Sequence, residues 1–93
     1  MKISGAQVKA ARFLLKITQP ELAKATGVGE RTIQKLEADE AVPKPATLQK
    51  ILSELEHRGI EFTNGTGIGV RLNFEKAAEF ARAGSTGRKE AEH

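Results

Sequence analysis

Four polar side chains between residues 30 and 35 have the types and the spacing needed to contact the edges of DNA bases. Arg31, Gln34 and Lys35 are three and four residues apart, so they share one face if this segment is helical. The planar fork of Arg31 can donate to O6 and N7 of guanine together, Gln34 can bind adenine, and Lys35 can reach a guanine or a phosphate. Glu30 either accepts from cytosine N4 or favours the positive end of the helix dipole. The alternative is a solvated helix face, so the choice depends on the surrounding elements.

The segment around these residues carries the signals of two short helices joined by a tight turn. Thr18 is an N-cap, Pro20 lies in the first turn where it costs no hydrogen bond, and Glu21 completes a capping box. Gly27 suits the left-handed residue that ends the first helix. The buried sides of the two helices are supplied by apolar residues, namely Leu22, Ala23, Val28, Ile33 and Leu36. This pattern is typical of a helix-turn-helix, whose second helix enters the DNA major groove.

The same segment resembles the Cro/cI-type repressors, which are also called the XRE family. The resemblance is carried by residues 18–23, 27–28, 32–33 and 36–37. It extends over about residues 4 to 56, and it departs at Gly29, where such proteins often have a capping serine or threonine, and at Ala38-Asp39, where they have Asn-Gly. The resemblance implies a lambda-repressor-like domain of four helices that binds double-stranded DNA. It also implies a homodimer with half-sites about 34–36 Å apart.

The resemblance further assigns roles to single residues. The four polar residues named above occupy the positions that contact bases in the family. A glutamine at the position of Gln19 contacts the DNA backbone and braces the recognition helix, and a helix N-terminus is a good place for a phosphate. We expect Thr32 to touch a phosphate or a base edge, and Lys44 to be a second phosphate contact. Lys2, Lys9 and Lys24 are weaker candidates.

Arg12 and Glu37 lie among apolar neighbours on their predicted helices, where a lone charge is costly. We therefore expect the two side chains to pair with each other. Such a pair, which joins the first helix to the end of the third, is common in the family. Its role is structural, although a place for Arg12 near a phosphate stays open.

Composition excludes several other classes of function. The chain has 93 residues, no cysteine and two histidines far apart, so we expect no disulfide, no metal site and no cofactor. Glu54, Glu56 and His57 fit a solvated helix face better than an acid–base group, and the glycines of 65–69 lack the following helix that a phosphate loop needs. With no nucleophile and base to assemble, we expect no enzyme. Without a membrane-spanning run or a leader, we expect a soluble cytoplasmic protein.

The charge is concentrated in the first part of the chain. Net charge is +3; residues 1–58 carry ten Lys and Arg against seven Asp and Glu, whereas residues 59–93 carry five of each. All of the excess positive charge therefore belongs to the part that would bind nucleic acid.

The periodicity predicts a mainly α-helical fold with three regions: a DNA-binding domain at 1–58, a β-hairpin with a short helix at 59–83, and a disordered tail at 84–93. The predicted helices are 4–16, 19–26, 30–38, 46–58 and 75–83, and the predicted strands are 60–63 and 70–74. Phe13 is expected to be packed. Glu61 and Arg71 are expected to pair across the hairpin.

The second half has two interpretations. The apolar hairpin residues are a possible dimer interface, by edge-to-edge strand pairing, or they complete the core of one chain; they are Ile60, Phe62, Val70, Leu72 and Phe74. The sequence favours a transcriptional regulator that acts as a repressor. An antitoxin with a protein partner, or an interaction module that has lost DNA binding, are the alternatives.

Overall fold

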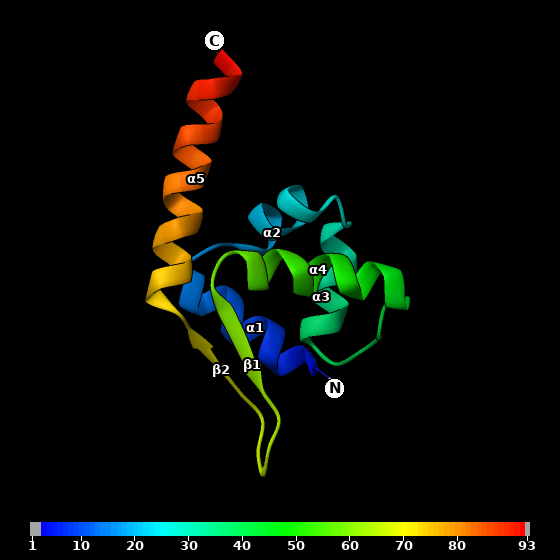
Figure 1. The fold of residues 1–93 in the computed structure, drawn as a ribbon. Helices are drawn as coiled ribbons and strands as arrows, with labels where there is room; N and C mark the ends of the chain where they lie inside the picture. The colour runs from blue at the N-terminus through cyan, green and yellow to red at the C-terminus, as the bar shows by residue number, and fades with distance from the viewer. Residues whose placement is uncertain (1–2, 93) are drawn as a thin grey trace.

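The computed structural model describes residues 3–92, with side chains over 3–83, and it is mainly α-helical, as predicted (Figure 1). The elements are α1 (Gly5–Leu15), α2 (Gln19–Thr26), α3 (Glu30–Glu37), α4 (Pro45–His57), β1 (Ile60–Thr63), β2 (Gly69–Leu72) and α5 (Phe74–Glu92). The first four helices form the body of the molecule, with the hairpin against α1 and α4. α5 projects from the body on the side where the hairpin ends (Figure 1).

Local capping fixes α1 and α2 where the sequence placed them. The side chains of Ser4 and Thr18 each accept a hydrogen bond from the backbone N–H of the third residue of the helix, Gln7 in α1 and Glu21 in α2. The side-chain oxygen of that third residue in turn accepts from the backbone N–H of the cap residue. Gly27 ends α2 at φ +75°, a left-handed conformation that glycine adopts without a Cβ penalty. Gly29 begins α3 with no side-chain cap, so the departure from the family at this position leaves the helix start uncapped.

The core lies between the four helices and is closed by the first residue of the hairpin. Its largest fully buried side chains are Leu22, Ile33, Ile51, Leu55, Ile60 and Val8. The prediction that Phe13 is packed was wrong, because its side chain is 61% exposed. It lies beneath the guanidinium of Arg12, 4.9 Å from the ring centroid, so a cation–π contact takes the place of core packing.

The hairpin pairs Ile60 with Leu72 and Thr63 with Gly69 in an antiparallel register. The second strand ends at Leu72 and not at residue 74, because Asn73 accepts a hydrogen bond from the backbone of Lys76 and so caps α5. Phe74 consequently belongs to α5, and its side chain is 81% exposed.

The apolar face of the hairpin completes the core of a single chain. Ile60 is only 2% exposed, so this residue fits the interpretation in which the hairpin completes the core of one chain. Phe62, Val70 and Leu72 are half-buried and pack against the same core. This packing favours the core interpretation, and a dimer interface at the hairpin stays a prediction.

Gln7 on α1 fastens the hairpin at the base of its loop, a role that the sequence did not predict. Its side chain is buried, and Nε2 donates to the carbonyl oxygens of Thr63 and Gly69, at 3.1 and 3.0 Å, and to Oδ1 of Asn64 at 2.9 Å. The side-chain oxygen accepts from Ser4 N. One amide therefore joins the start of α1 to both strands.

The polar face of the hairpin is organised around Glu61. Its carboxylate accepts from Arg71 across the hairpin, as predicted, and from Asn73 and Lys76. These donors, of which Arg71 has the largest effect, hold the pKa of Glu61 below its ordinary value of 4.5.

The last helix is longer than the sequence predicted. α5 continues to Glu92, beyond the predicted end at residue 83, because 84–92 contains no proline and several good helix formers. The ring of Phe80 packs on the end of α4, 5.1 Å from the ring of His57 and 4.8 Å from the guanidinium of Arg58. The disordered tail at 84–93 stays a prediction, with His93 outside the described residues.

Gln7→Leu is expected to lower the free energy of unfolding by about 1–3 kcal/mol, because it removes the part-buried hydrogen bonds that the Gln7 amide makes to the hairpin. Urea unfolding followed by circular dichroism measures this change. The control is Gln49→Leu, which removes an exposed contact to Ser53 and should change stability little. Equal effects of the two substitutions would contradict the fastening role.

Glu61→Gln is expected to destabilise the protein near pH 7 and to have a smaller effect near pH 3. Because folding lowers the Glu61 pKa, the carboxylate adds stability above its unfolded-state pKa, and this is lost as the pH falls through the folded-state pKa. Unfolding free energies at the two pH values measure the difference. Exposed Glu56, changed to Gln, is the control, and a loss from Glu61→Gln that is independent of pH would contradict the account.

Candidate nucleic-acid interface

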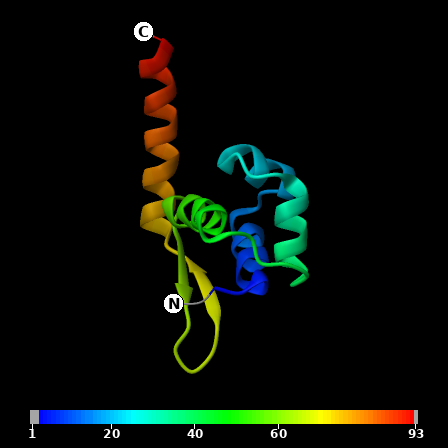
Figure 2. The same ribbon diagram turned by 90° about the vertical axis from the view of Figure 1, so that its right-hand side faces the viewer.

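Helix α3 lies on the side of the body away from the hairpin and α5, and no other element covers its outer face (Figure 2). Its inner face is anchored by Ile33 and Leu36, which are 0% and 2% exposed. Arg31 and Gln34 are exposed, and Lys35 is half-buried beside them. The helix therefore offers to solvent the polar residues that the sequence singled out.

The four polar residues differ in whether their side chains already form hydrogen bonds within the protein. Oε2 of Glu30 accepts from Nε2 of Gln34 at 3.1 Å, one helical turn away. Within the part of the chain that the structure describes, no hydrogen bond or ion pair is made by the side chains of Arg31 and Lys35. A guanine edge would thus meet a free guanidinium at Arg31, whereas an adenine would compete with Glu30 for the amide of Gln34.

The position of α3 is set by the carboxylate of Glu37 at its last turn. Arg12 on α1 forms a two-pronged pair with it, Nε to Oε2 and Nη2 to Oε1, both at 2.9 Å. Gln19 at the start of α2 donates Nε2 to Oε1 at 3.0 Å. Three helices therefore meet at one buried carboxylate, and the predicted pair of Arg12 with Glu37 lies at their junction.

The charges at this junction are well satisfied. Arg12 also donates Nη1 to the carbonyl oxygen of Ile17 at 3.1 Å. The hydrogen bond to Glu37 raises the pKa of Arg12, although burial partly opposes it. The guanidinium therefore stays charged, and its donors are turned towards the protein. The alternative that Arg12 contacts a phosphate has no support in this geometry.

A second set of residues was predicted from the sequence to contact the DNA backbone. Lys44 is exposed and precedes α4, whose first residue is Pro45 and whose start has no side-chain cap. The start of α2 has fewer free N–H groups, because Pro20 has none and the N–H of Glu21 is bound by Thr18. Thr32 is half-buried, and the side chain of Gln19 points to Glu37. Lys2 lies outside the described residues.

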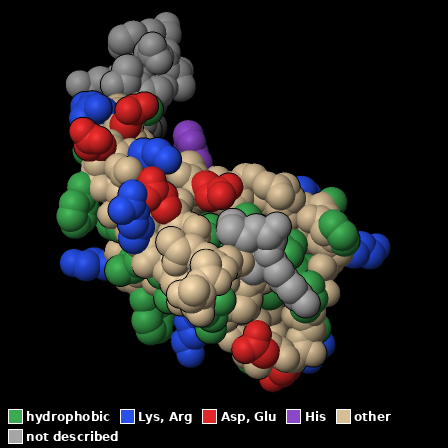
Figure 3. Space-filling view, turned by 60° about the horizontal axis from the view of Figure 1, so that its bottom comes forward, with side chains coloured by type: hydrophobic (Ala, Val, Ile, Leu, Met, Phe, Trp, Pro, Cys, Tyr) green, Lys and Arg blue, Asp and Glu red, His purple; other side chains and the backbone are tan. Residues whose placement is uncertain are grey.

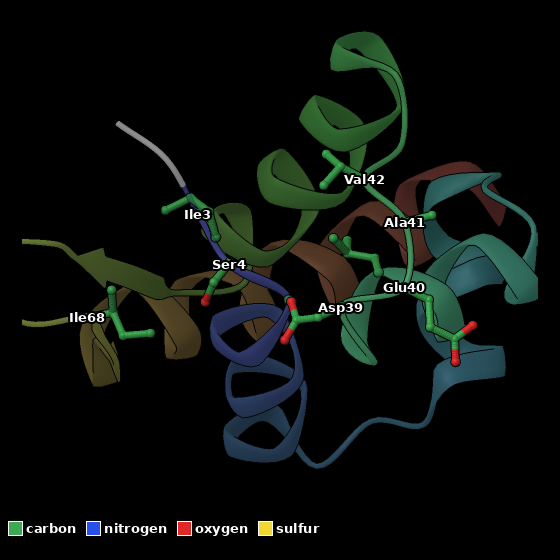
Figure 4. A pocket seen from close by; sticks show the side chains of 9 residues that line it. Ile3, Ser4, Asp39, Glu40, Ala41, Val42 and Ile68 are labelled. Atoms are coloured by element: carbon green, nitrogen blue, oxygen red, sulfur yellow. The ribbon is translucent and has the colours of Figure 1, made fainter.

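A hollow of about 520 Å³ lies at the far end of α3, between the start of α1 and the loop that leads to α4 (Figure 4). It is lined by apolar side chains such as Ile3, Val42 and Ile68, and the acidic residues Asp39 and Glu40 also belong to its lining. An added Cβ at Gly5 would overlap the Leu36 carbonyl oxygen, so only glycine lets α1 approach α3 here. Carboxylates repel phosphate, so this hollow is unsuited to contact with a DNA backbone.

Comparison with known proteins agrees with this geometry. A protein-family model described as helix-turn-helix matches residues 8–59, more than half of the chain. The chain belongs to this Cro/cI-type, or XRE, helix-turn-helix family. The match runs from α1 to the end of α4, and the helix-turn-helix family is one of DNA-binding regulators and not of enzymes. A search of curated proteins gave no match.

The described residues add two further observations. None of their helices is both long and apolar enough to cross a membrane. They also contain no group of three or more histidine, cysteine or acidic side chains that would hold a metal ion.

Arg12→Met is expected to cost about 3–5 kcal/mol of stability, because it leaves the Glu37 carboxylate buried without its partner. Arg12→Met with Glu37→Met should cost less than the single change, because no lone charge remains. Thermal and urea unfolding of both variants measure the difference. Glu54→Gln breaks a pair with Arg58 that lies within one turn of α4 and is partly open to solvent, and it should cost below about 1 kcal/mol. A double variant less stable than the single one would contradict the account.

Proposed function

We propose that this protein is a sequence-specific regulator that inserts α3 into the major groove of double-stranded DNA and acts in the cytoplasm as a repressor. The observation that carries the proposal is the free guanidinium of Arg31 on the uncovered face of a helix whose inner face is fully anchored. Repression needs no further domain, because a protein that occupies its operator blocks other proteins there.

The interface divides into base contacts and anchors. Arg31 supplies the strongest discrimination, since a bidentate contact to guanine is worth about 1–3 kcal/mol against a wrong base. Gln34, Lys35 and Glu30 contact neighbouring bases. Lys44, with the unpaired backbone N–H groups that open α4, holds a phosphate and fixes the depth of α3 in the groove.

Gln19 acts through the protein as well as on the DNA. Its amide donates to Glu37, so the side chain that marks the start of α2 also holds the last turn of α3. Its backbone N–H remains for a phosphate, and Thr32 lies on the same helix as the base contacts. A shift of α2 on the phosphate backbone would therefore be transmitted to α3.

The test compares Arg31→Ala with Lys44→Ala on a duplex selected by the unchanged protein and on a scrambled duplex. Arg31→Ala should cost about 1–3 kcal/mol on the selected duplex and relax preference at one base pair. Lys44→Ala should weaken both duplexes alike and reduce the salt slope by about one unit. Fluorescence anisotropy over a range of salt concentrations measures both effects.

The matched control is Arg82→Ala on α5, which removes an exposed arginine far from α3. It should leave discrimination between the duplexes unchanged. Identical behaviour of Arg31→Ala and Lys44→Ala would contradict the division between base contact and anchor. Undiminished binding by both variants would contradict the proposed function itself.

A further inference from the structure

A side-chain hydrogen bond joins two of the four polar residues on the outer face of α3. Nε2 of Gln34 donates to Oε2 of Glu30 at 3.1 Å, from one helical turn further along the chain. Both residues are exposed, so the bond lies on the surface that the proposed function turns towards DNA. The bond therefore determines which atoms of Gln34 a base would meet.

Glu30 differs from other acidic residues of this protein in the kind of partner it has. Acidic side chains lie beside Lys and Arg side chains along α5, as Figure 3 shows. Glu54 and Glu61 each pair with an arginine. Within residues 3–83, Glu30 takes part in no such ion pair. Its carboxylate is bound instead by a neutral amide, which has a donor end and an acceptor end.

The chemistry of the carboxylate decides which end of the amide faces it. A carboxylate only accepts hydrogen bonds, whereas an amide donates from its nitrogen and accepts at its oxygen. The opposite orientation of the Gln34 amide would bring two acceptor oxygens together, so Nε2 must face Glu30. Glu30 lies in the first turn of α3, where the helix dipole favours a negative charge. Oε1 of Gln34, which accepts no hydrogen bond from the described residues, is the atom left for a base.

We infer that Glu30 determines base specificity by holding the amide of Gln34 in one orientation. This inference rests on the proposed insertion of α3 into the major groove. Adenine and cytosine present an amino group there, which donates to the free Oε1 without disturbing the bond to Glu30. Guanine and thymine present acceptor atoms at the corresponding places and would have to take Nε2 from Glu30. The pair therefore selects a base with an amino group opposite Gln34.

A glutamine without this partner would discriminate less between bases. Rotation about the last bond of the side chain exchanges its oxygen and its nitrogen, so the amide can bind either a donor or an acceptor. A contact between residues four apart on an exposed helix is weak in the free protein. It becomes stronger where DNA excludes water from α3, because hydrogen bonds are stronger in surroundings of low dielectric constant. Orientation is therefore fixed most firmly in the complex, where the base is selected.

The test measures base preference on duplexes that differ at one base pair of a site selected by the unchanged protein. Gln34→Ala identifies the base pair that Gln34 contacts, as the one where preference falls most. The unchanged protein should favour adenine or cytosine over guanine or thymine there by about three- to tenfold. Glu30→Gln should reduce this ratio to below about twofold, because the new amide both donates and accepts. Fluorescence anisotropy measures the affinities.

A double variant shows whether Glu30 acts through Gln34. In the Gln34→Ala protein, Glu30→Gln should have no further effect on preference at that base pair. Glu30→Gln also removes a negative charge, so it should raise the affinity for every duplex alike. The matched control is Glu40→Gln, which removes an exposed carboxylate just beyond α3 and should leave the ratio unchanged. Circular dichroism shows that each variant is folded.

Each outcome decides the inference. Loss of the ratio in Glu30→Gln but not in Glu40→Gln supports it. An unchanged ratio in Glu30→Gln, an equal loss with and without Gln34, or a preference for guanine or thymine opposite Gln34 would overturn it. If the guanine preference due to Arg31 persists in those cases, the proposed function stands without the inference. A protein that selects no duplex would overturn both.

Discussion

The arrangement of this protein depends on one buried carboxylate. Glu37 lies at the end of the helix that faces solvent, and it accepts hydrogen bonds from Arg12 on α1 and Gln19 on α2. Each of the three helices is short, and helices of this length are marginal alone in water. Their relative orientation is therefore fixed by tertiary contacts, and the charged junction complements the apolar contacts of Ile33 and Leu36.

This junction links stability to function. Buried ion pairs contribute little net stability when compared with apolar replacements, but they are costly to break. The pair also fixes a geometry, because a bidentate arginine tolerates few orientations of its partner. A helix that contacts bases must be placed to within a fraction of an ångström, so fixed geometry is the more important contribution here.

The positions of the helices and of the hairpin could be predicted, because local sequence signals determine them. Capping residues and the apolar period located α1, α2 and α3 to within a residue, and the change of period located the hairpin. Arg12 and Glu37 were recognised because a charge among apolar neighbours needs a partner. Gln7 was missed because its partners are backbone carbonyl groups more than 50 residues away, which leave no pattern in side-chain types. Phe13 was misjudged because apolar character alone does not tell which side of a small domain a residue faces. The base and phosphate contacts stay predictions, since they depend on a partner molecule.

The most direct test of the central claim is selection of DNA by the purified protein from a random duplex library at about 150 mM salt, where unspecific attraction is partly screened. The account predicts an enriched motif with two-fold symmetry, whose half-sites lie about one helical turn apart. Enrichment of no motif would contradict the claim that α3 contacts bases in a sequence-specific way.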